Sequence, residues 1–227
     1  DPEIVRNSRK WKYDLALNLS GKKGNTDKFH LGTEIDVRLK GPDDELRFGF
    51  EYEQGEENDN KTDDRAFGRI GYERFNPKNV GWYLHNALET DKISDINMRS
   101  TTGGGASYRV INNDAQTLIV RGGLGYRFTD FETEDREDDS SATFETSLEH
   151  SYQYKDFCWL ENKLYYSPAL DDFANYRAIH DSSLKIPVGN GESFWIRMGI
   201  KNEYESQTSA EEKLDTSYYT QLIYSWK

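Results

Sequence analysis

The chain has 227 residues, of which 35% are hydrophobic, 31% are charged and 14% are aromatic, and its formal net charge is −12. This charge argues against a nucleic-acid partner, since phosphate binding requires a basic surface, and the single cysteine excludes an intrachain disulfide or a cysteine-ligated zinc site. The aromatic content is too high for a disordered polyanion, and no apolar run approaches the ~18 residues of a membrane-spanning helix.

Apolar and polar residues alternate along most of the chain, with the period of two that is typical of a β-strand. Residues 11–19 (WKYDLALNL) carry Trp, Tyr and Leu on the odd positions, and residues 29–39 and 46–53 repeat the alternation. We expect further strands near 66–74, 80–90, 100–110, 116–128, 142–154, 157–167, 175–187, 193–204 and 216–226. The sequence thus predicts about twelve strands, each about the 9–11 residues that a tilted membrane strand needs.

The connections between these strands alternate in length. The even connections are tight turns rich in Gly, Pro, Asn and Asp: 41–44 (GPDD), 76–79 (NPKN), 111–114 (INND), 155–156 (KD) and 189–192 (GNGE). Most odd connections are longer and acidic: 55–64, 132–140, 167–173 and 205–213. If the strands run up and down, all short turns lie at one end, as in outer-membrane barrels.

Aromatic residues on the apolar face collect toward both strand ends, with aliphatic residues between them. A soluble core gives no reason for this sorting, whereas a bilayer does, because aromatic rings favour the headgroup levels. We therefore expect the apolar face to point outward to lipid. The predicted aromatic girdle comprises Trp11, Tyr13, Trp82, Tyr154, Tyr224, Trp226, Phe128, Tyr166 and Tyr204.

These patterns predict an all-β fold, an antiparallel up-and-down transmembrane β-barrel over residues 10–227, after an N-terminal periplasmic segment at 1–9. We expect this barrel in the bacterial outer membrane, with both termini periplasmic because the strand number is even. The alternative is a soluble ligand-binding β-barrel with an apolar interior.

Three segments carry a resemblance to known proteins. The end of the chain, SYYTQLIYSWK (217–227), resembles the signature by which the insertion machinery recognises outer-membrane proteins, although Lys227 follows the last aromatic residue. The stretches LALNLSGKKGNTDKFHLGTEIDV (15–37) and YYSPALDDFANYR (165–177) are similar to the YdiY-like family, described as salt-induced outer membrane proteins with a domain of unknown function. The resemblance implies a location, a barrel fold and the barrel-insertion machinery as a partner, but no chemistry.

The inward face carries cations and anions in equal numbers, so the negative excess belongs to loops, turns and termini. The predicted lumen-lining cations are Lys12, Arg38, Arg47, Arg69, Arg109, Arg121, Arg127, Lys163, Arg177, Lys185, Arg197 and Lys201. The predicted lumen-lining anions are Asp14, Glu34, Asp36, Glu51, Glu53, Glu73, Glu89, Glu145, Glu149, Glu161, Asp181 and Glu203. They line a polar pore, or they form an ion-pair network that fills the interior. The function predicted from the sequence is therefore a narrow polar pore or a structural envelope protein.

We expect no enzyme, cofactor or metal site, and an outer-membrane hydrolase is the last-ranked alternative, after the soluble ligand-binding barrel. Outer-membrane phospholipases use a Ser/His pair on the lipid-facing wall, but here His150 faces outward and Ser151 inward, so the two cannot cooperate. The four histidines are not spaced as metal ligands. The acidic loops lack the spacing of a calcium loop, and loose cation bridging to lipopolysaccharide phosphates is the alternative. Membrane lipid and lipopolysaccharide are the predicted partners, and the sequence does not predict the oligomeric state.

Overall fold

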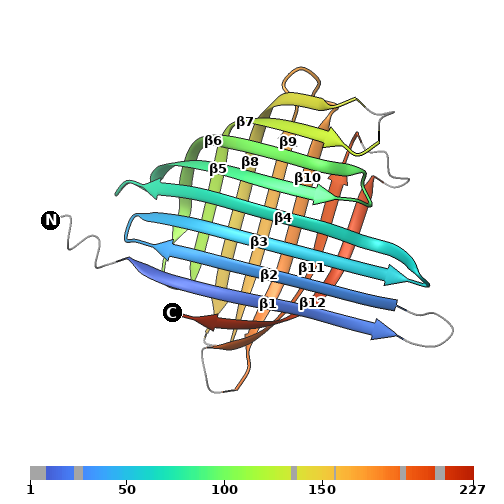
Figure 1. Cartoon of the computed structure of the whole chain (residues 1–227). Coiled ribbons are helices and arrows are strands. Elements are labelled where there is room, and N and C mark those ends of the chain that lie inside the picture. Colours follow the sequence, from blue (N-terminus) through green and yellow to red (C-terminus); the bar gives the residue numbers. More distant parts are fainter. Residues whose placement is uncertain (1–8, 23–27, 134–136, 156, 190–192, 208–212) are drawn as a thin grey trace.

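The computed structural model describes residues 9–22, 28–133, 137–155, 157–189, 193–207 and 213–227. Within these residues the chain forms twelve antiparallel strands that pair in sequence order, and β1 closes against β12 (Figure 1). The described residues contain no helix that is long and apolar enough to cross a membrane. The predicted fold class, an antiparallel up-and-down transmembrane β-barrel, is confirmed.

Every predicted strand is present, and several extend past their predicted bounds at the long-loop end. The strands are β1 (Lys10–Lys22), β2 (Lys28–Lys40), β3 (Asp44–Glu57), β4 (Asn60–Phe75), β5 (Val80–Asp91), β6 (Ile96–Asn112), β7 (Gln116–Phe131), β8 (Asp139–Tyr154), β9 (Cys158–Pro168), β10 (Tyr176–Pro187), β11 (Phe194–Glu205) and β12 (Leu214–Trp226).

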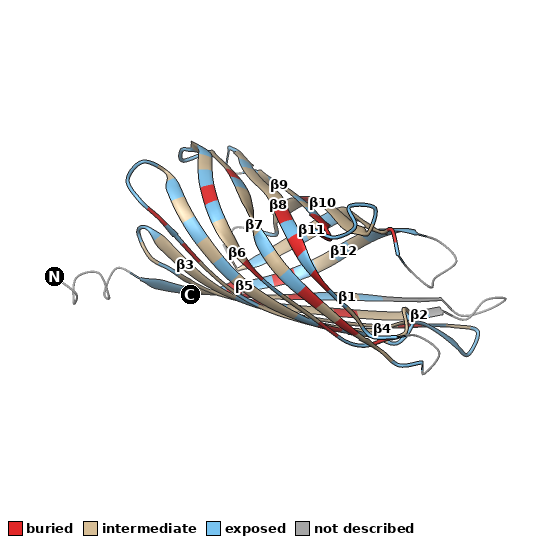
Figure 2. Ribbon diagram, turned by 90° about the horizontal axis from the view of Figure 1, so that it is seen from above, coloured by how far each residue is buried: buried red, intermediate tan, exposed pale blue. Residues whose placement is uncertain are grey.

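The barrel has a polar inside and an apolar outside. Most of its buried side chains are polar or charged, including Glu145, which is 1% exposed, and Glu89, which is 4% exposed. Outward residues such as Leu17 and Leu222 are 46% and 51% exposed. Figure 2 shows buried and exposed positions interspersed along single strands. This distribution is the reverse of a soluble barrel, so the apolar face points away from the lumen.

The prediction of a long acidic loop at 55–64 is wrong. β3 and β4 continue through this segment and are joined by a two-residue turn at Asn58 and Asp59, whose φ angles are 49° and 64°. Positive φ at both central residues is the requirement of a type I′ hairpin turn, and Asn and Asp tolerate it well. The tight turn at Asn58 and Asp59 therefore forms although the polar composition of residues 55–64 suggested a loop, and the segment is a hairpin of paired strands.

Parts of several predicted connections lie outside the described residues. They are the turn at 24–26 within the YdiY-like segment, residues 134–136 and 208–212 of the acidic loops, residue 156 and residues 190–192. Residues 1–8 also lie outside, so the predicted N-terminal segment and its boundary at residue 9 remain a prediction.

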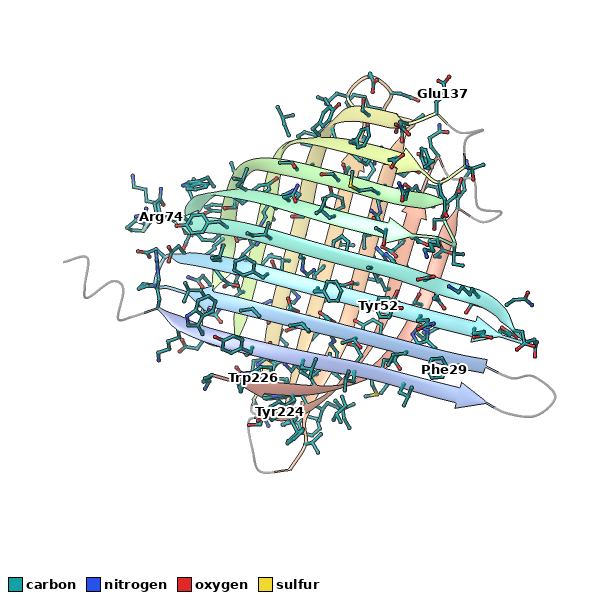
Figure 3. The ribbon with its side chains drawn as sticks, in the orientation of Figure 1. Phe29, Tyr52, Arg74, Glu137, Tyr224 and Trp226 are labelled. Carbon is teal, nitrogen blue, oxygen red and sulfur yellow. The ribbon has the colours of Figure 1, made fainter. Side chains whose placement is uncertain are left out.

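Aromatic side chains gather near both ends of the outer wall. Tyr13 stacks on Trp226 with ring centroids 5.3 Å apart, and Tyr224 lies 5.3 Å from the same indole ring. Figure 3 shows Tyr224 and Trp226 toward the end of the barrel where the chain termini lie, and Phe29 and Tyr52 toward the other end. Of the predicted girdle, Trp11, Trp82, Tyr154, Tyr166, Tyr224 and Trp226 are exposed, and Tyr13, Phe128 and Tyr204 are partly exposed.

The two faces of β1 should respond differently to charge. Replacing outward Leu17 by Arg puts a cation against hydrocarbon and should lower the free energy of unfolding by ~2–4 kcal/mol. Replacing its inward neighbour Asn18 by Arg should cost less, because that side chain enters the polar lumen. Urea unfolding in lipid vesicles, followed by tryptophan fluorescence, measures both. A larger loss for Asn18→Arg would show that the two faces are reversed.

A charge-lined lumen as the candidate functional site

Charged side chains from strands far apart in the barrel meet inside the lumen. Because alternate residues of each strand point inward, the inward carboxylates and guanidinium groups approach one another from all sides. They form three clusters along the barrel, which we call the loop-end, middle and turn-end clusters.

The loop-end cluster surrounds Glu89 of β5. Arg65, Arg99 and Arg177 approach its carboxylate to 2.7, 3.5 and 3.0 Å. The same arginines also contact two carboxylates of β11. These contacts are Arg65–Glu203 (3.1 Å), Arg177–Glu203 (3.3 Å) and Arg99–Glu205 (2.6 Å), with Lys201 3.4 Å from Glu203. The cluster therefore ties β4, β5 and β6 to β10 and β11 through the interior.

The turn-end cluster joins β3, β4, β7 and β8. The Arg121 guanidinium donates to both carboxylate oxygens of Glu73 at 2.8 Å, a bidentate geometry, and also reaches Glu149 at 3.0 Å. Arg47 lies 3.1 Å from Glu149 and pairs with Glu45 on its own strand. Glu149 thus accepts from two arginines that come from different parts of the wall.

The middle cluster lies between the other two. Arg69 of β4 is 3.1 Å from Asp36 of β2 and 3.7 Å from Glu51 of β3. Arg197 of β11 pairs with Glu34 of β2. Beside this pair, a cavity of about 30 Å³ is lined by Asp14, Arg38, Lys185 and other charged residues, which leaves room for only a few water molecules.

Glu145 occupies a separate polar site on the inner wall. Its carboxylate accepts a hydrogen bond from the Tyr165 hydroxyl at 2.9 Å and lies 2.8 Å from Nε2 of His85. Glycines of β6 and β7 make room for it. A Cβ atom at Gly103 would lie 2.7 Å from Nε2 of His85, and one at Gly125 would lie 2.7 Å from Oε1 of Glu145. These glycines let the side chains lie close against the wall.

The remaining predicted lumen residues are less tightly paired. Arg127 donates to Asn175 at 3.2 Å, and Asp181 accepts from Tyr219 at 2.6 Å. In the described part of the chain, Nε of Arg38 is buried with no hydrogen-bond partner, and Glu161 and Lys163 form no ion pair. Some of the predicted lumen residues therefore belong to the ion-pair clusters, and the others make single hydrogen bonds or no ion pair.

Four members of the clusters were absent from the sequence prediction: Glu45, Arg65, Arg99 and Glu205. Each lies one residue beyond the end of a predicted strand, on the inward parity of that strand. Continuing the alternation by one step would have found them. They add two cations and two anions, so the lumen keeps equal numbers of both.

The outer wall contains hydrogen-bonded polar residues, among them His150, which the sequence predicts to face outward. On β7–β10, His150 lies between Gln116 (2.8 Å) and Asn162 (3.4 Å), and Ser182 donates to Asn162 at 2.7 Å. Because Asn162 separates Ser182 from His150, the imidazole is not placed to take the serine proton. Among the described residues, no group of three or more His, Cys, Asp or Glu side chains could hold a metal ion.

Neutralising Glu89 tests the loop-end cluster. In Glu89→Gln three buried arginines lose a shared carboxylate, and the free energy of unfolding should fall by about 3 kcal/mol. The control Glu161→Gln removes a lumen carboxylate without an ion pair among the described residues, and it should cost less than about 1 kcal/mol. Urea unfolding in vesicles compares the two. Equal losses would mean that the cluster does not hold the strands together.

Solved structures match the chain at low sequence identity. The NanC porin has a TM-score of 0.56 and 8% identity, over 95% of this chain and 98% of its own. The KdgM porin in complex with disordered oligogalacturonate has 0.49 and 10%, over 95% and 99%. The translocator domain of the autotransporter NalP from Neisseria meningitidis has 0.45 and 10%, over 99% and 92%. The likeness to the NanC porin concerns the fold. No curated protein matches the chain.

One protein family matches nearly the whole chain. The match covers residues 15–226, which include all of β2–β12 and most of β1. YdiY-like proteins are of this kind, so the resemblance of segments 15–37 and 165–177 is confirmed. The chain therefore belongs to the family described as proteins of unknown function, DUF481.

Proposed function

We propose that this protein is a narrow, charge-lined pore of the bacterial outer membrane. The observation that carries this proposal is a set of ion pairs between nearly opposite walls. Arg47 of β3 contacts Glu149 of β8, Arg177 of β10 contacts Glu89 of β5, and Arg99 of β6 contacts Glu205 of β11. In each pair the two strands stand five apart in a ring of twelve.

Such pairs narrow the path that twelve strands would otherwise enclose. A barrel of eight strands is already filled by its side chains, and a wider barrel leaves a channel unless long side chains cross it. Here Arg and Glu side chains reach across and pair, so that small ions and water pass while larger solutes do not. A structural envelope protein with a closed lumen is the second candidate, favoured by the density of the same ion pairs.

The proposed orientation has both chain termini in the periplasm and the longer loops outside the cell. Because the strand number is even, both termini lie at one end of the barrel, and the short turns at that same end support its periplasmic position (Figure 1). The acidic loops then face lipopolysaccharide, whose phosphates they contact through bridging divalent cations. A hydrolase is disfavoured, since Ser182 and His150 are not in contact.

Planar-bilayer recording of the purified barrel tests the pore. We expect current steps far smaller than those of an open porin. Arg121→Ala should enlarge the steps, because it removes the side chain that joins Glu73 to Glu149 and opens the turn-end cluster. The control Arg74→Ala changes an arginine on the outer surface near the barrel rim (Figure 3) and should leave the steps unchanged.

Two results would contradict this proposal. Large porin-like steps in the unmodified protein would mean that the ion pairs do not narrow the lumen. No current in either the unmodified protein or Arg121→Ala would favour the structural candidate over the pore.

Ion selectivity provides a separate prediction. The lumen charges balance, so the wall itself should discriminate weakly, whereas the acidic loops should add a mild preference for cations at the mouth. This preference should fade between ~0.1 M and ~1 M salt, as the screening length falls from about 10 Å to about 3 Å. Reversal potentials across a salt gradient measure it. Strong anion selectivity that persists at high salt would show that unpaired lumen cations control the current.

A further inference from the structure

The outer wall carries a groove of about 440 Å³ across β8–β12, close to the long-loop end. Its outward lining includes Leu148, Leu164, Tyr166, Tyr204 and Leu214, and no charged side chain lines it. The groove lies on the face that carries the exposed apolar residues, so membrane lipid is the medium next to it.

A small residue between large ones creates the groove. Ala178 of β10 pairs in register with Tyr166 of β9 on one side and Tyr204 of β11 on the other. Above it Tyr176 packs against both rings, with centroids 5.4 and 5.3 Å away. The three tyrosines therefore surround the alanine on three sides, and the alanine methyl group forms the floor.

One edge of the groove is polar, and its hydrogen bonds determine which ring nitrogen of His180 carries the proton. Thr216 donates to Oδ1 of Asn202 at 2.8 Å, which leaves the Asn202 amide nitrogen to donate to Nδ1 of His180 at 3.2 Å. A neutral imidazole whose Nδ1 accepts carries its proton on Nε2. Among the described residues, that Nε2–H has no acceptor, and an unmet donor in an apolar site is costly.

We infer that this groove binds the ester- or amide-linked acyl chain of an outer-leaflet lipid, and that His180 Nε2–H donates to the carbonyl oxygen of the linkage. The acyl chain packs against Tyr166, Ala178 and Tyr204. Its carbonyl oxygen accepts the last hydrogen bond of the series that begins at Thr216. The absence of charge in the lining disfavours a phosphate headgroup inside the groove. The closed barrel leaves no free strand edge for a peptide to extend. The assignment to the outer leaflet rests on the proposed orientation, whereas the groove itself does not.

Native mass spectrometry of the detergent-purified barrel tests this inference with two phosphatidylethanolamine probes. One probe has ester-linked chains and the other has ether-linked chains of the same length, which lack the carbonyl. The unmodified protein should retain the ester lipid about tenfold better, as expected for one hydrogen bond of ~1.4 kcal/mol. His180→Leu should retain both lipids equally. Ala178→Trp, which fills the groove, should retain neither.

Ala66→Trp is the matched control, because Ala66 also faces outward and pairs with a tyrosine, Tyr52, on the opposite part of the wall. It should keep the tenfold preference. Heat-modified gel migration checks that each variant is folded. Equal retention of both lipids by the unmodified protein, or unchanged retention in Ala178→Trp, would overturn the inference. The inference would also be overturned if the unmodified protein bound a second copy of the chain and Ala178→Trp did not.

Bilayer conductance of Ala178→Trp separates this inference from the proposed pore. The groove lies outside the barrel, so filling it should leave the current steps unchanged. Loss of lipid retention with unaltered current supports the groove independently of the pore. Lipid preference in a protein that never conducts would contradict the pore and leave the groove in place.

Discussion

A strand inside a hydrocarbon layer must pair all of its backbone amide and carbonyl groups, since lipid offers them no partners. Twelve strands meet this requirement only if the first pairs with the last. That seam is short, because β1 and β12 pair from Tyr13–Trp226 to Leu17–Leu222, whereas β1 and β2 pair over the whole length of β1. The aromatic stack of Tyr13, Trp226 and Tyr224 lies at this seam, so it reinforces the place where closure has fewest backbone contacts.

Closure also determines where charge can go. With one face of every strand against lipid, the other face takes the cations and anions of the membrane-spanning part. There is little space for water among them, so the charges pair with one another, and twelve strands bring opposite walls within reach of Arg and Glu side chains. Where bulky inward groups such as His85 and Glu145 would crowd the interior, Gly103 and Gly125 supply space at the wall. The ion-pair clusters therefore follow from the closure of the sheet.

The alternation of apolar and polar residues predicted most of the strands, because this alternation depends only on residues that are neighbours in the sequence. Strand ends were predicted poorly, because alternation weakens where acidic residues occupy both faces. For that reason the alternation does not place Arg65, which follows Asp63 and Asp64, in the lumen, and it predicts a loop instead of the hairpin at Asn58 and Asp59.

Contacts between walls could not be predicted from the pattern. Whether Arg47 meets Glu149 depends on strand number and stagger, which a single strand does not encode. The relay from Thr216 through Asn202 to His180 likewise spans three strands and depends on their register. Parity indicates which face a side chain is on, but only the closed sheet decides what it touches.

Alternate residues of each strand meet lipid and lumen, and the native tryptophans report on both environments. Trp82 and Trp226 are exposed on the outer wall, while Trp159 and Trp195 pack edge to face at 4.8 Å on the inward parity. In single-tryptophan variants refolded into vesicles with brominated acyl chains, bromine quenches an indole that touches lipid. We expect strong quenching of Trp82 and Trp226 and little of Trp159 or Trp195. Quenching of Trp159 or Trp195 as strong as that of Trp82 would contradict the structure described here.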